Sequence, residues 1–108
     1  MAVKVNLRNL SLTPVVMTVG PCTMYTLTLV NNTGADAWVQ IFDTAVLGSI
    51  VPSITPPAYT RKIPAGQMAD IPLPPQGVFY SQGITAISTT ADMGNVGSAL
   101  GVHMYASV

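Results

Sequence analysis

The sequence predicts an all-β, single-domain protein folded as an antiparallel β-sandwich or jelly roll. Short runs of apolar residues alternate with polar residues at the period of two that is typical of strands with one buried face. Nine glycines and nine prolines separate these runs, and no window shows a helical period. A chain of 108 residues has the length of one ordinary domain, so residues 1–108 are assigned to one sandwich of roughly seven to nine short strands.

The first expected strand begins near the N-terminus. Between residues 3 and 8 apolar residues alternate with Lys4, Asn6 and Arg8, which is typical of an edge strand protected by charge. The apolar parity changes before Leu12, so we expect a bulge or short turn near Asn9. A second strand is expected at 15–19, and Gly20-Pro21 then predicts a turn.

The stretch from Cys22 to Asp43 is the centre of the prediction. Its first half alternates threonine with apolar residues over 25–30, and the polar segment 31–34 then favours a turn. A second apolar run covers 37–42. The simplest interpretation is two antiparallel strands joined by a short polar loop.

The second of these strands has two unlike faces. Ala37, Val39 and Ile41 share one parity and are expected in the core. The other face carries large aromatic residues, which a strand covered on one side does not leave in water. Either a second layer or a second subunit must cover this face. We therefore expect a protein interface that includes residues of this face and of the first strand: Trp38, Gln40, Phe42, Lys4, Asn6 and Arg8.

The second half of the chain predicts shorter elements. Prolines between 44 and 57 leave room for no more than short edge segments. Strands are expected at 58–63, 68–73, 84–90 and 99–108, with a rigid proline-rich connector at 72–77 and a loop at 91–98. Residues 78–80 lead into Gly83 before the strand at 84–90. Arg61 and Lys62 are expected on a solvated strand edge.

The composition limits the classes of partner. Only 7% of the residues are charged, and four basic and four acidic groups cancel, so we expect neighbouring molecules to cover much of the surface. Four basic groups cannot form the stripe that nucleic acid or an anionic membrane requires. Cys22 is the only cysteine, which excludes an intrachain disulfide. The N-terminus lacks the apolar run of a signal peptide, so synthesis in a cytosol is expected.

The reactive side chains are too few and too scattered for catalysis or metal binding. The chain has one histidine, one cysteine, four aspartates and no glutamate. His103 lies in a strand pattern with no nearby carboxylate or second histidine, so a structural role is expected. Each aspartate is assigned to a strand end or loop. We therefore expect no enzyme activity, no catalytic residues, no metal and no cofactor.

Several phrases of the sequence resemble small β-sandwich virion proteins of tailed bacteriophages, known as head decoration, cement or structural proteins. The first are Leu27-Thr28-Leu29-Val30-Asn31-Asn32 and Trp38-Val39-Gln40-Ile41-Phe42-Asp43. Leu47-Gly48-Ser49-Ile50-Val51-Pro52, Ile63-Pro64-Ala65-Gly66, Gly77-Val78-Phe79-Tyr80-Ser81-Gln82-Gly83-Ile84 and Ile87-Ser88-Thr89-Thr90 continue the likeness.

This resemblance implies a non-enzymatic structural protein that decorates and stabilises the outside of a phage capsid. Its location would be the virion, assembled in the host cytoplasm. The implied partners are the major capsid protein or other virion proteins, and further copies of the chain, with a trimer favoured by the three-fold positions that decoration proteins occupy. The alternative is a receptor- or carbohydrate-binding module of a head fibre or tail, for which the candidate aromatic residues are Trp38, Tyr59, Tyr80 and Tyr105.

Overall fold

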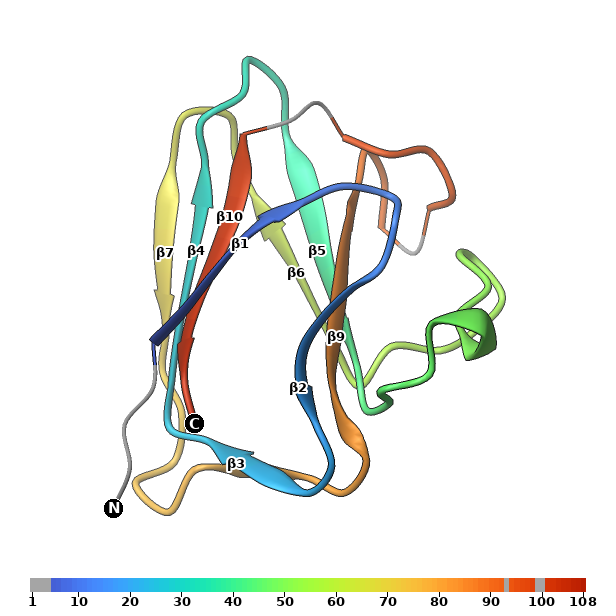
Figure 1. Cartoon of the computed structure of the whole chain (residues 1–108). Coiled ribbons are helices and arrows are strands. Elements are labelled where there is room, and N and C mark those ends of the chain that lie inside the picture. The colour runs from blue at the N-terminus through green and yellow to red at the C-terminus, as the bar shows by residue number, and fades with distance from the viewer. Residues whose placement is uncertain (1–4, 93, 99–100) are drawn as a thin grey trace.

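Two four-stranded antiparallel sheets form the protein (Figure 1). The structure is a computed structural model that describes residues 5–92, 94–98 and 101–108. Sheet A contains, in spatial order, β1 (Val5–Leu10), β10 (Val102–Ser107), β4 (Thr26–Asn31) and β7 (Met68–Ile71). Sheet B contains β2 (Val15–Val19), β9 (Gly83–Thr89), β5 (Ala37–Phe42) and β6 (Tyr59–Ile63). A separate pair, β3 (Cys22–Met24) and β8 (Val78–Tyr80), closes one end of the sandwich.

The order of the strands is that of a jelly roll. When the short strands β3 and β8 are set aside, the eight remaining strands follow the orders 1-8-3-6 in sheet A and 2-7-4-5 in sheet B. Every ladder is antiparallel, and the chain passes repeatedly from one sheet to the other. Two interlocked Greek keys of this kind define the double-sheet jelly roll. The predicted fold class is confirmed.

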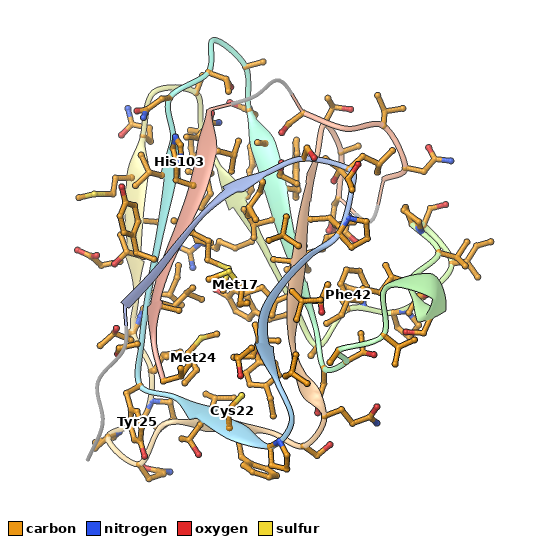
Figure 2. All side chains as sticks on the ribbon, in the orientation of Figure 1. Met17, Cys22, Met24, Tyr25, Phe42 and His103 are labelled. Carbon is orange, nitrogen blue, oxygen red and sulfur yellow. The ribbon has the colours of Figure 1, made fainter. Side chains whose placement is uncertain are left out.

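The core lies between the sheets, where alternate residues of each strand meet. Leu27 and Leu29 of β4 face inward from sheet A, and Val39 and Ile41 of β5 face inward from sheet B, all buried. Figure 2 shows Met17 between the layers. The predicted core face of Ala37, Val39 and Ile41 is confirmed, because none of these side chains is exposed.

Strand β9 is buried on both faces. All seven of its residues are buried, including the outward-facing Thr85, Ile87 and Thr89, which lie opposite the outward residues of β5. The connection between β5 and β6 covers part of this outer face, since its Ile50 packs on Ile87. The chain's own loop therefore covers the part of this outer face that includes Phe42 and Ile87.

The prediction that the strands before and after residues 31–34 form a hairpin is wrong. Strand β4 belongs to sheet A and β5 to sheet B, so residues 32–36 cross between the layers. Asn31 holds this crossing: its fully buried Nδ2 donates to the carbonyls of Ala35 at 2.8 Å and Ile63 at 2.9 Å. Its Oδ1 accepts from the backbone N–H and the hydroxyl of Thr33. The polar segment is a turn, as expected, but it connects two sheets.

Of the bulge or short turn expected near Asn9, the bulge is absent, and the chain bends only after Leu10. Strand β1 pairs with β10 in unbroken register through Leu10. The parity changes because the chain leaves sheet A after Leu10. The carbonyl of Ser11 then accepts the backbone N–H of Ser88 in β9, a strand of sheet B. A register shift occurs instead in β2, between Val16 and Thr18.

The outer strands agree with most expectations. β1 and β6 are edge strands, and Arg61 and Lys62 of β6 are exposed. β7 ends at Ile71, two residues before the expected end, because Pro72 cannot continue the ladder. Asp70 was expected at a strand end or in a loop, but it lies inside β7. Its Oδ1 accepts a hydrogen bond from the Thr28 hydroxyl at 2.7 Å.

Candidate interaction surface

Phe42, predicted at a subunit interface, is part of a small second core. It is 2% exposed and packs with Ile50 and Ile87, and Figure 2 shows it beside the connection that leads to β6. The sequence allowed either a second layer of the same chain or a second subunit to cover this face. At Phe42 it is the same chain that covers it. The interface prediction at Phe42 is therefore wrong, because the chain's own loop has taken that place.

Gln40 is likewise buried, with no exposed area. Its Nε2 donates to Thr89 Oγ1 at 3.1 Å and to the Gly94 carbonyl at 3.5 Å. Its Oε1 has no hydrogen-bond partner in the described part of the chain. The side chain ties the loop after β9 to sheet B, so Gln40 is also unavailable to a second subunit.

Trp38 is the accessible member of this face, and it is half-buried. The Lys62 Nζ lies 5.5 Å from the centroid of its ring, and the same Nζ lies 3.4 Å from the Asp36 carboxylate. The pKa of Asp36 is lowered, first by the backbone N–H of Ala65 and then by Lys62. The ion pair beside the ring thus joins Lys62 of the neighbouring strand β6 to Asp36, which immediately precedes β5.

The other predicted interface residues belong to the N-terminal strand. Lys4 lies outside the described residues. Asn6 and Arg8 occupy β1, opposite Ala106 and Met104 of β10, and their side chains are outside the description. The edge position of their strand is confirmed.

The aromatic residues considered for carbohydrate binding do not meet at one place. Tyr80 is 5% exposed in the core, and burial, followed by the charge of Asp43, raises its pKa. Tyr59 is half-buried against the core. Tyr105 is 37% exposed and lies on the outer face of sheet A, whereas Trp38 lies on the outer face of sheet B.

The titratable side chains of the described residues are dispersed over the molecule. Within the described residues, no set of three His, Cys, Asp or Glu side chains could hold a metal ion, and no pocket is found there. His103 is half-buried on β10, and its buried Nδ1 has no hydrogen-bond partner among the described groups. Cys22 is a half-buried free thiol. No helix in the described ranges is both long and apolar enough to span a bilayer.

The most distinctive surface feature is the β5–β6 loop, residues 43–58. β5 and β6 are antiparallel neighbours, yet sixteen residues join them, where a hairpin can close with two. The loop projects beyond the sheets on the right of Figure 1 and contains the short 3₁₀ helix η1 (Leu47–Ser49).

The β5–β6 loop has an internal hydrogen-bond network. The Ser49 hydroxyl donates to the Val46 carbonyl at 2.7 Å, and Thr55 Oγ1 accepts the backbone N–H of Val51 at 2.8 Å. The backbone N–H of Thr55 also donates to the Val51 carbonyl at 2.8 Å. Thr85 Oγ1 of β9 donates to the Thr44 carbonyl at 2.6 Å and fixes the start of the loop to sheet B.

Apolar side chains of this ordered loop remain in water. Val46, Val51 and Ile54 are 62%, 47% and 74% exposed, while Ile50 turns inward and is 7% exposed. The sequence prediction missed this surface because prolines and glycine hide any strand or helix period. The available signal was different: no charged residue occurs between Asp43 and Arg61.

Comparisons with protein-family models, with curated proteins and with solved structures find no match for this chain.

Proposed function

We propose that this chain is a non-enzymatic structural protein of a bacteriophage virion that binds the outside of the capsid and reinforces it. The observation that carries the proposal is the β5–β6 loop, an ordered projection with no charged residue after Asp43 and with three exposed aliphatic side chains. The three side chains lie within nine consecutive residues of one loop, and exposed apolar patches often mark sites of protein interaction.

Composition and fold support the same function. A chain with 7% charged residues and no net charge is suited to a crowded assembly more than to free solution. Jelly rolls occur in viral capsid proteins and in lectins, which is support by analogy of fold alone. The partners in this proposal are the major capsid protein and further copies of the chain, most simply three copies around a capsid three-fold axis.

Quantitative mass spectrometry of purified virions tests this function. We expect the chain to occur in a fixed ratio to the major capsid protein. We also expect particles made without its gene to be less resistant to heat or low salt. Sedimentation velocity of the isolated protein tests the trimer. Absence of the chain from purified particles would exclude a structural role in the virion.

A second candidate function is a carbohydrate- or receptor-binding module of a fibre or tail. The observation in its favour is the half-buried Trp38 beside the Asp36–Lys62 ion pair, since sugars stack on aromatic rings that have polar neighbours. Binding of the isolated protein to host cells that is lost in Trp38→Ala, and kept in Tyr105→Ala, would favour this function over capsid decoration.

A further inference from the structure

The length of the β5–β6 loop points to a function beyond connecting two strands. Loops longer than about 12–15 residues are uncommon in compact domains and most often have a function or are disordered. This loop has sixteen residues and is ordered by its own hydrogen bonds and by Ile50, which packs on Phe42 and Ile87. A disordered connector would need none of these contacts.

The loop is ordered before any partner binds. Pro52, Pro56 and Pro57 restrict its backbone, and Ser53 adopts a positive φ of 66°, which the surrounding turn must stabilise. The backbone N–H of Ala58 donates to the Ile41 carbonyl at 2.8 Å and anchors the end of the loop. Ordering in advance lowers the entropy cost of binding.

The chemistry of the loop selects an uncharged, apolar partner surface. Val46, Val51 and Ile54 are exposed, and no charged residue occurs between Asp43 and Arg61. A loop that enters a lipid interface is expected to carry tryptophan and basic residues, and residues 44–58 contain neither. A protein surface is therefore favoured over a membrane.

The small size of the loop favours a groove as its binding site. Contact with the same loop of another copy is disfavoured. Three aliphatic side chains cannot provide the roughly 800 Å² per partner that a specific interface buries. A groove that surrounds the loop covers its sides as well as its tip and so removes more apolar area from water.

We propose that the β5–β6 loop inserts as a preformed unit into an apolar, uncharged groove on the capsid protein. This inference rests on the proposed virion function and deepens it, because it assigns the attachment contact to Val46, Val51 and Ile54. It also separates attachment from Phe42, which packs on Ile50 and holds the loop in place, and from Gln40, which holds the loop after β9.

Binding to purified capsid particles that lack the chain tests the inference. Ile54→Asp places a charge at the most exposed of the three aliphatic side chains, so we expect at least a tenfold loss of affinity for the particles. Val19→Asp is the matched control, since Val19 is 77% exposed at the end of β2 and lies outside the loop. We expect it to bind as the wild type does, and both variants to keep the wild-type circular dichroism spectrum and melting temperature.

Each outcome decides a different point. Equal particle binding by Ile54→Asp and wild type would overturn the loop assignment and leave the virion function standing. Failure of the wild-type chain to bind would overturn both. Two more assays test other partners of the loop. Binding to phosphatidylcholine or phosphatidylserine vesicles that is abolished by Ile54→Asp would identify a lipid surface. An oligomer of the wild-type chain that dissociates only in Ile54→Asp would identify a second copy. Either result would overturn the capsid groove.

Discussion

The carboxylate of Asp43 accepts the backbone N–H of Gln82 at 2.9 Å and so joins the end of β5 to the turn between β8 and β9. The same carboxylate accepts the backbone N–H of Ser81 at 3.0 Å, the Ser81 hydroxyl at 3.1 Å and the backbone N–H of Gly83 at 3.4 Å. One side chain thus satisfies a run of backbone donors at the base of the β5–β6 loop.

Asp43→Asn should lower the free energy of unfolding by about 1–2 kcal/mol, because the neutral amide offers one acceptor oxygen and loses the charge-assisted bonds. Urea denaturation at pH 7 measures the loss. Asp92→Asn is the matched control, because the structure gives the exposed Asp92 carboxylate one bond, from the Thr60 hydroxyl at 3.2 Å. Equal losses in the two variants would contradict the assigned role of Asp43.

Acid should weaken the fold through the same residue. Burial raises the pKa of Asp43, but the hydrogen bonds from Gln82, Ser81 and Gly83 together lower it below the ordinary value. A carboxyl group whose pKa is lower in the folded state stabilises the fold above its unfolded pKa and loses that stabilisation as the pH falls through its folded pKa. Stability measured from pH 6 down to pH 2 should therefore fall less steeply in Asp43→Asn than in wild type. Parallel acid curves would exclude this linkage.

Phe42 and Trp38 should behave differently although they share one face of β5. Phe42→Ala empties the second core and should cost the isolated domain about 3–5 kcal/mol. Trp38 is half-buried, so Trp38→Ala should leave the isolated fold close to intact. If the Trp38 ring contacts a neighbour, assembly should weaken by about 2 kcal/mol. Chemical denaturation measures the loss of stability in both variants, and particle binding measures the loss of assembly. If Trp38→Ala unfolds the isolated domain, the Trp38 ring supports the core.

Asn31→Ala should destabilise the crossing between the sheets by about 2–3 kcal/mol, because it leaves the buried Ile63 carbonyl without its side-chain donor. The neighbouring Asn32 is exposed, so Asn32→Ala should change stability by less than about 0.5 kcal/mol. Thermal unfolding of the pair provides the comparison. A silent Asn31→Ala would show that water replaces the amide at no cost.

Gly83→Ala should cost about 1–3 kcal/mol through backbone strain and a clash. Its φ is +147°, and an added Cβ would lie 2.6 Å from the Thr18 carbonyl oxygen. Gly34→Ala is the matched control, because a Cβ at that position meets nothing within 4 Å. Chemical denaturation should separate the two variants clearly, and equal stability would mean that β2 can shift away from β9.

Local patterns in the sequence predicted the elements well and their pairing poorly. The alternation in 37–42 identified Val39 and Ile41 as core residues because a strand exposes its faces at a fixed period. Nothing in that period tells whether the next strand pairs beside it or crosses to the other layer. The crossing at Asn31 depends on the Ile63 carbonyl, 32 residues further along the chain, and no local signal reports such a contact.

The surface was harder to predict than the core for the same reason. Trp38, Gln40 and Phe42 were correctly placed together on the outer face of β5, but what covers that face depends on how residues 43–58 fold back. Those residues have turns and prolines in place of a strand or helix period. The packing of Ile50 on Phe42 could therefore not be predicted from the sequence. The length and lack of charge of this segment were visible, and they now carry the inferred contact.

The position of β10 between β1 and β4 has a consequence for synthesis on the ribosome. β1 and β4 are made early, but the strand that bridges them is Val102–Ser107. A nascent chain that has completed β9 can pair β2, β9, β5 and β6 into sheet B, while sheet A still lacks its second strand and exposes the inner side chains of β4. Sheet A can therefore close only once residues 102–107 have been made, and a chain stalled before residue 102 leaves β1 and β4 without the strand that lies between them.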